Sequence, residues 1–202
     1  MRISGFVVPV ALAALVAGCS FHATPDPSLS ARDVNWMASA PKVEEEPGFG
    51  RYLMADPTGE APGTIVVDTD NRFLYHVKDA GLATRYGVGI GASGFEWSGR
   101  AHVAYKRAWP RWTPPAEMIT RQPQLERYRY GMEPGPDNPL GPRALYIHQG
   151  NTDTLYRIHG NSDERTIGQA VSSGCVRLLP QDIIHLHDNV RSGSPLLVTA
   201  LS

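Results

Sequence analysis

A histidine and a cysteine near the C-terminus carry the side chains that acyl transfer needs. Cys175 lies 16 residues after His159, which Gly160 follows directly. A thiol attacks a carbonyl as its thiolate, and only a few per cent of a thiol with a pKa of about 8.5 is ionised at pH 7. A cysteine nucleophile therefore needs a nearby base, and His159 is the candidate. Glycines beside both residues leave room for a substrate and for N–H groups that face an oxyanion.

The first 19 residues have the pattern of an export signal. Arg2 supplies a positive charge, residues 6–16 are apolar, and small residues precede Cys19. The apolar stretch is too short to span a membrane comfortably. Its Val-Ala-Gly-Cys ending resembles a bacterial lipoprotein box, and ordinary cleavage beside an incidental cysteine is the alternative. We expect residues 1–18 to be a signal peptide and Cys19 to be a lipidation site.

The cysteine count supports a reactive role for Cys175. The chain has two cysteines, and if Cys19 is lipidated or removed, Cys175 has no partner for an intrachain disulfide in an oxidising compartment. A small buried hydrophobe is the alternative for a free cysteine. The polar and glycine neighbours of Cys175 favour the nucleophile. No His-Glu-x-x-His or paired-cysteine ligand pattern occurs, so we expect neither a metal nor a cofactor.

Composition limits the class of protein. The 202 residues fit one domain of ordinary size plus a tail. A net charge of −1 leaves no excess of basic residues to bind phosphates, so we expect no nucleic-acid partner. The 20 glycines and 17 prolines favour many turns, and therefore strands over long helices.

Short β-rich segments separated by turn formers dominate the chain from residue 64 onward. We expect strands over residues 64–67, 72–77, 83–90, 101–107, 144–148, 154–159 and 195–200. Pro114-Pro115 predicts a short helix over residues 116–119. A second helix is expected to start at Pro180, with Gly193 as its stop.

Two segments lack this strand pattern. Residues 122–142 are rich in proline and glycine, which predicts a long ordered loop or lid. Residues 19–61 are rich in Ala, Pro, Ser and acidic side chains. This composition predicts a flexible tether between a lipid anchor and the folded domain.

Several motifs together resemble the active-site half of the YkuD-type L,D-transpeptidases. The similarity covers roughly residues 62–200 and runs through Val66-Val67-Asp68, Gly87-Val88-Gly89-Ile90-Gly91, Trp109-Pro110-Arg111-Trp112, Asn138-Pro139-Leu140-Gly141, Tyr156-Arg157-Ile158-His159-Gly160 and Ser172-Ser173-Gly174-Cys175-Val176-Arg177-Leu178. The resemblance implies a mainly β fold, a β-sandwich of mixed sheets with short helices, in which the Cys and His motifs meet at one groove. It makes residues 62–202 an L,D-transpeptidase catalytic domain.

The resemblance also implies roles for the motif residues. Cys175 would form a thioester with the diaminopimelate carbonyl of a tetrapeptide stem and release D-alanine, with His159 as base and later acid. The carbonyl of Gly160 would orient the imidazole, as a carboxylate does in other triads.

Four further residues are candidates for the oxyanion hole or for substrate binding. Backbone N–H groups of Ser172, Ser173 and Gly174 are oxyanion-hole candidates. Arg177 is expected either to bind a substrate carboxylate or to form a structural salt bridge. His148 is a second histidine in this region, but it matches the motif less well as the base.

The acceptor of the acyl group is left open. Another stem peptide would give a 3-3 cross-link, and a wall-tethered lipoprotein would be attached through a lysine. Water would make the protein an endopeptidase or carboxypeptidase, and a non-catalytic wall-binding module is the alternative outside enzymes. The expected location is the periplasm, with a lipid anchor in the outer membrane.

Overall fold

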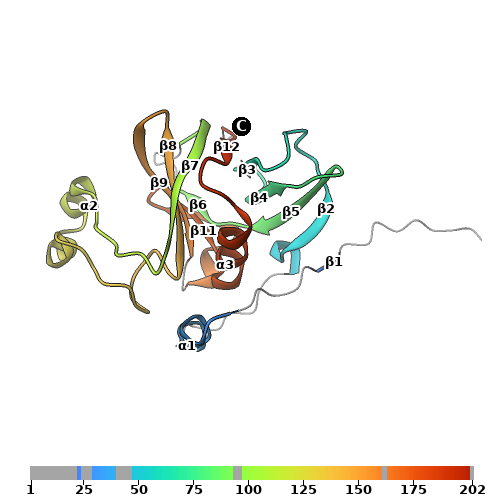
Figure 1. Cartoon of the computed structure of the whole chain (residues 1–202). Helices are drawn as coiled ribbons and strands as arrows, with labels where there is room; N and C mark the ends of the chain where they lie inside the picture. The colour runs from blue at the N-terminus through green and yellow to red at the C-terminus, as the bar shows by residue number, and fades with distance from the viewer. Residues whose placement is uncertain (1–21, 24–28, 40–46, 93–96, 161–162, 201–202) are drawn as a thin grey trace, which may run out of the picture.

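The computed structural model describes residues 22–23, 29–39, 47–92, 97–160 and 163–200 (Figure 1). The predicted signal peptide, residues 1–18, and the predicted lipidation site, Cys19, lie outside these residues. The strands are β1 (His22–Ala23), β2 (Tyr52–Ala55), β3 (Ile65–Asp68), β4 (Phe73–Val77), β5 (Leu82–Gly87), β6 (Ile90–Gly91), β7 (Gly99–Ala108), β8 (Arg143–Gln149), β9 (Thr152–Gly160), β10 (Ala170–Ser172), β11 (Val176–Leu178) and β12 (Pro195–Val198). The helices are α1 (Ala31–Ser39), α2 (Ala116–Arg121) and α3 (Pro180–Asn189), with 3₁₀ turns η1 (Pro47–Phe49), η2 (Pro123–Tyr128) and η3 (Glu164–Thr166).

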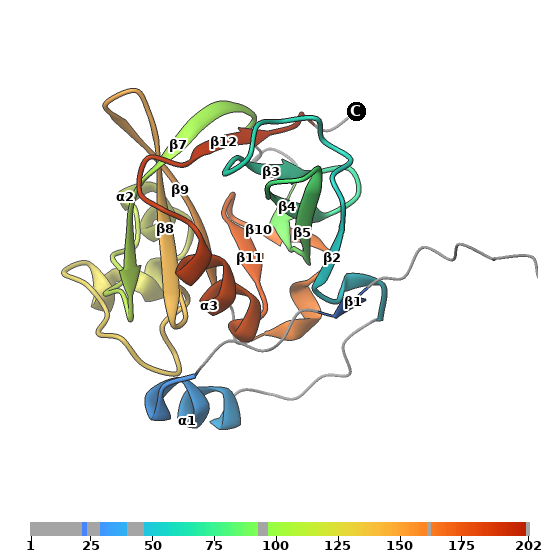
Figure 2. The ribbon, with the colours of Figure 1, turned by 45° about the vertical axis from the view of Figure 1, so that its right-hand side comes forward.

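The strands form a large mixed sheet and a small one. The large sheet has the order β1-β2-β5-β4-β3-β12-β7-β8-β9-β11, and β10 pairs with β6 in the small one. The β12–β3, β11–β9 and β10–β6 pairs are parallel, and the other named pairs are antiparallel. The two halves of the large sheet lie on either side of α3 (Figure 2). This mainly β fold with mixed sheets and short helices confirms the fold class expected from the sequence.

A shared core joins the two halves of the sheet. It takes Ile65 and Val67 from β3, Leu145 and Ile147 from β8, and Ile183 from α3, all at most 1% exposed. Neighbouring strand residues point to opposite faces, so a strand that is buried on both sides is apolar throughout. Strand β3 is of this kind, because Val66 belongs to a second apolar cluster. The uninterrupted apolar run of β3 therefore marks a central strand.

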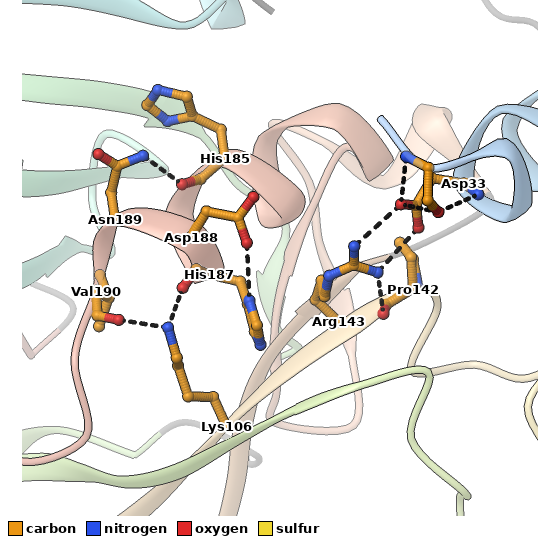
Figure 3. A network of polar contacts seen from close by, with 10 residues as sticks. Asp33, Lys106, Pro142, Arg143, His185, His187, Asp188, Asn189 and Val190 are labelled. Atoms are coloured by element: carbon orange, nitrogen blue, oxygen red, sulfur yellow. Dashed lines mark hydrogen bonds and ion pairs between the residues drawn. The ribbon is translucent and has the colours of Figure 1, made fainter. Parts of the chain in front are cut away.

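Helix α3 forms where the sequence predicts it, directly after β11. Pro180 opens the helix, where its missing N–H costs nothing, and Ile183 and Leu186 are fully buried. At its other end, Lys106 of β7 donates hydrogen bonds from Nζ to the carbonyls of His187 and Val190 (Figure 3). A cation at a helix C-terminus satisfies carbonyls that lack partners within the helix. None of the described helices is long and apolar enough to cross a membrane.

Part of the segment expected to be a flexible tether is instead packed on the domain. Within the expected tether, residues 19–61, helix α1 buries Asp33 against Arg143 and Trp36 against Trp109. Strand β2 pairs with β5 and extends the large sheet beyond the expected domain start at residue 62. Composition did not reveal this packing because it rests on a few side chains whose partners lie far along the chain.

Candidate active site

Two parallel strands hold His159 and the segment that follows Cys175. His159 of β9 is paired with Arg177 of β11 on one side and with Ala144 of β8 on the other. Cys175 directly precedes β11. His159, Cys175 and Arg177 line the same cavity of about 640 Å³. The fold thus brings together the three residues that the sequence placed in two separate motifs.

The turn before Cys175 is closed by the side chain of Ser172. Its hydroxyl donates to the carbonyl of Cys175 at 2.6 Å and accepts from the N–H of Gly174 at 3.1 Å. Gly174 has a φ of 118°, which L side chains rarely adopt. The Gly174 N–H, expected as an oxyanion donor, is therefore engaged within the turn. Gly174 instead lines a separate small cavity.

His159 is buried, and its surroundings favour the neutral ring. Nδ1 lies 2.5 Å from the carbonyl oxygen of Gly160, and a carbonyl only accepts, so Nδ1 carries the hydrogen. Burial, with the nearby positive charge of Arg177, lowers the pKa of His159 to about 4, against hydrogen bonds to the backbone of Gly160 and Pro139. The neutral imidazole then leaves Nε2 as the nitrogen that can accept a proton.

Cys175 is a protonated thiol in this resting site. Burial raises its pKa, although a backbone hydrogen bond from Arg157 and the positive charges of Arg157 and Arg177 act in the opposite direction. Burial also lowers the pKa of Arg177. The thiol and the imidazole are thus both neutral at pH 7, and the thiolate must form by proton transfer to a base.

A close approach of two glycines brings a loop turn against the strand of His159. A Cβ on Gly160 would lie 2.7 Å from Cδ of Pro142, and a Cβ on Gly141 would lie 3.0 Å from the carbonyl carbon of Gly160. Gly141 also has a φ of 64°. The contact at Gly160 is too short for a side chain, and a side chain at Gly141 would be tightly packed and strained by its positive φ, so both positions favour glycine. This approach places Pro139 beside the imidazole.

Residues 110–141 form a lid over the cavity. The buried side chain of Asn138 organises it: Nδ2 donates to the carbonyls of Pro110, Met132 and Glu133, and Oδ1 accepts from the N–H of Leu140. The helix predicted over 116–119 is α2, and the ordered loop predicted over 122–142 contains the short 3₁₀ helix η2.

The lid supplies most of the cavity wall that sequence reasoning left unassigned. Its lining residues are Trp112, Met118, Gln122, Leu125, Arg127, Tyr128, Met132, Asp137, Pro139 and Leu140. Most of these are apolar, and Arg127 and Asp137 add one charge of each sign. The motifs at residues 109–112 and 138–141 were the sequence signals near this wall, because the loop between them carries no periodic pattern.

The second histidine that the sequence offered as a base lies away from this cavity. His148 of β8 is 4.0 Å from Asp153 and does not line the cavity, so it is not placed to act as the base. Among the described residues, no group of three or more His, Cys, Asp or Glu side chains is arranged to hold a metal ion.

Known proteins of similar sequence are named as transpeptidases. The chain is 36% identical over 143 residues to "Probable L,D-transpeptidase YbiS" of Escherichia coli, covering 65% of this chain and 42% of that protein. It is 35% identical over 140 residues to "Probable L,D-transpeptidase ErfK/SrfK" of Escherichia coli, with the same coverage. The chain therefore spans less than half the length of these relatives.

Two solved structures and one family model complete the comparison. A Brucella melitensis structure titled "Probable carnitine operon oxidoreductase caia" is 42% identical, with a TM-score of 0.52 over 83% of this chain and 98% of that chain. An L,D-transpeptidase from Mycobacterium smegmatis is 20% identical, with a TM-score of 0.50 over 68% of this chain and 58% of that chain, and shares the fold. The YkuD family model, described as the L,D-transpeptidase catalytic domain, matches residues 62–198. Because this match covers more than half of the chain, the protein belongs to the YkuD family of L,D-transpeptidase catalytic domains.

Proposed function

We propose that the protein is a cysteine-dependent peptidoglycan L,D-transpeptidase, an acyltransferase with Cys175 as nucleophile. The observation that carries the proposal is the shared cavity of Cys175 and His159, in which His159 Nδ1 donates to Gly160. That hydrogen bond orients the ring and leaves Nε2 to accept the thiol proton. Family membership supports the reaction class.

In the donor half-reaction, Sγ of Cys175 attacks the diaminopimelate carbonyl of a tetrapeptide stem while its proton passes to Nε2 of His159. The carbonyls of Gly160 and Pro139 stabilise the imidazolium, because hydrogen bonds to both favour the charged ring. The C–N bond then breaks, the imidazolium returns its proton to the leaving amine, and D-alanine departs from a thioester. The N–H groups of Ser173 and Cys175 are the oxyanion donors in this proposal.

In the acceptor half-reaction, an amine attacks the thioester, His159 removes its proton, and the thiol is restored. Arg177 lines the cavity, and its positive charge favours the thiolate. Of its two expected roles, substrate-carboxylate binding and a structural salt bridge, its position at the cavity favours carboxylate binding. The acceptor is another stem peptide or the lysine of a wall-tethered lipoprotein.

The place of action follows from the first 19 residues. We propose that residues 1–18 direct export, that Cys19 is lipidated, and that the enzyme works in the periplasm from a lipid anchor in the outer membrane. This proposal rests on the apolar stretch and on the Val-Ala-Gly-Cys ending.

Intact-mass spectrometry with a disaccharide-tetrapeptide tests the proposal. An acyl adduct with release of D-alanine is expected, with no adduct in Cys175→Ala and slower formation in His159→Ala. New cross-linked products identify a transferase, whereas free carboxylates without cross-links identify a hydrolase. The absence of both adduct and D-alanine would favour a wall-binding module.

A further inference from the structure

Helix α1 lies more than 70 residues before the lid in sequence but contacts both ends of it. The lid leaves β7 at Trp109 and enters β8 at Pro142, and these two roots are joined by a hydrogen bond of 2.7 Å from the Trp109 N–H to the Pro142 carbonyl. Figure 3 shows α1 beside Pro142 and Arg143. Because the two roots are joined to each other, contacts from α1 to either root affect the position of the whole lid.

A buried ion pair ties α1 to the second root. Arg143 donates to both carboxylate oxygens of Asp33 at 2.9 and 3.0 Å, and the two side chains are 11% and 1% exposed. Arg143 also donates to the Pro142 carbonyl at 2.9 Å. On the helix side, Ser30 donates to Asp33 through its N–H and its hydroxyl. Bidentate Arg–carboxylate pairs combine strength with fixed geometry.

Aromatic contacts tie α1 to the first root. Trp36, 4% exposed, meets the ring of Trp109 edge to face with centroids 6.1 Å apart. The guanidinium of Arg32 lies 4.2 Å from the centroid of the same ring, and it donates to the carbonyl of Pro134 within the lid at 3.5 Å. Trp109 has a φ of 49°, an uncommon backbone conformation that neighbouring contacts must hold in place.

The clamped root leads directly to the catalytic base. Arg143 is followed by Ala144, which pairs with His159 across β8 and β9. Gly141, two residues before Arg143, packs against Gly160. A shift of this root therefore moves both the lid and the Pro139 backbone that contacts the imidazole.

We propose that α1 is a positioning element for the active site, in which Asp33 and Trp36 clamp the two roots of the lid and so set the closure of the lid over Cys175. Neither residue lines the cavity. Their influence on catalysis runs through the lid, and that part of the inference rests on the proposed function.

The test compares Asp33→Asn and Trp36→Ala with Val34→Ala, a matched control on the same helix whose side chain is 48% exposed. Hydrogen–deuterium exchange reports local opening without any need for turnover. We expect amides of residues 110–141 to exchange at least about tenfold faster in both clamp variants, with β8 and β9 unchanged, because the contacts that are lost hold only the lid roots. In Val34→Ala, exchange should match the parent.

Kinetics supply the second measurement. With a disaccharide-tetrapeptide donor, KM should rise several-fold in the clamp variants while kcat changes less, since the lid contributes the walls that bind the donor. Alkylation of Cys175 by iodoacetamide should be faster in the clamp variants than in the parent, because a lid that opens more often exposes the thiol.

Three results decide the inference. Parental lid exchange in both variants would overturn it, and so would equally faster exchange throughout the sheet, which would reduce α1 to a general stabilising element. Faster exchange confined to the lid supports the clamp. If the parent protein releases no D-alanine, the proposed function fails, while the exchange data still decide the clamp.

Discussion

The floor of the active site and the lid above it are held by different kinds of interaction. The floor consists of β9, β11 and the turn of residues 172–175, where strand pairing fixes the backbone. The lid depends on side chains: Asn138 within it, and Asp33 and Trp36 from α1. Strand pairing is a cooperative array of hydrogen bonds, whereas each of these side-chain contacts of the lid is lost with one substitution. In the mechanism that we propose, the sheet holds the reacting side chains, and side-chain contacts of the lid set access to them.

The largest expected effect comes from removing the nucleophile from the floor. Cys175→Ala should abolish thioester formation and D-alanine release while leaving the fold intact, because a small side chain replaces a small one. Mass spectrometry checks the loss of the acyl adduct, and circular dichroism checks that the fold is intact. Val171→Ala, at a position 53% exposed on β10, is the matched control and should acylate normally. An adduct on Cys175→Ala would move the nucleophile elsewhere.

The next effect separates the two histidines of β8 and β9. His159→Gln should slow acylation about 10²- to 10⁴-fold, the usual contribution of a positioned general base. His148→Gln should leave the rate within about twofold, since His148 does not line the cavity. Single-turnover acylation rates measure both variants. Equal losses in the two would contradict the assignment of the base.

The pH dependence of the acylation rate tests whether His159 is buried in the working enzyme. Because burial lowers the pKa of His159 to about 4, the ring stays neutral and basic as pH falls through 6.5, the usual histidine value. Acylation should stay constant between about pH 5.5 and 8 and fall about tenfold per unit once pH drops below 4. A midpoint near 6.5 in the acylation rate would show that the site is open to water.

The same burial makes stability depend on pH. His76 is also buried, and burial together with the charges of Lys78 and His185 lowers its pKa to about 4. For His76 and His159, the unfolded chain binds protons more readily than the folded protein. Stability is therefore full above pH 6.5 and is lost as pH falls toward 4, by roughly 2 kcal/mol for each histidine. Urea unfolding at pH 7 and 4.5 measures the loss.

A smaller effect is expected when the lid loses its internal organiser. Asn138→Ala removes the donor to three carbonyls and the acceptor for the Leu140 N–H, which should cost about 1–3 kcal/mol of unfolding free energy. KM for the tetrapeptide donor should rise several-fold, with a lesser change in kcat. Tyr130→Ala, at a lid position 85% exposed, is the control. A loss confined to kcat would show that the lid takes part in the chemistry.

The smallest effect is expected at the C-terminal end of α3. Lys106→Met removes the hydrogen bonds to the last carbonyls of α3 and should lower the unfolding free energy by about 1 kcal/mol. Acylation kinetics should match the parent, because α3 is anchored by its buried face. Chemical denaturation and the acylation rate test the two statements. A marked change in the acylation rate would mean that a change at the end of α3 alters the turn that holds Cys175.

Sequence patterns predicted the longer regular elements better than the docking of α1, and they did not predict β11 of the floor. The strands of residues 65–68 and 73–77 and the helix from Pro180 follow patterns of alternation, period and capping that act over a few residues. The packed part of the expected tether was missed for the opposite reason. Its docking depends on Asp33 meeting Arg143, and no local pattern encodes a contact over 110 residues.

The sequence by itself determined the reaction class that we propose, because Cys175, His159 and their glycines are residue types with few chemical uses at that spacing. It also determined the mainly β fold through short alternating segments. Only the tertiary structure decided that the Gly174 N–H is engaged by Ser172 and that thiol and imidazole are both neutral. Burial and hydrogen-bond partners set these properties, and both arise from segments that meet only in the folded chain.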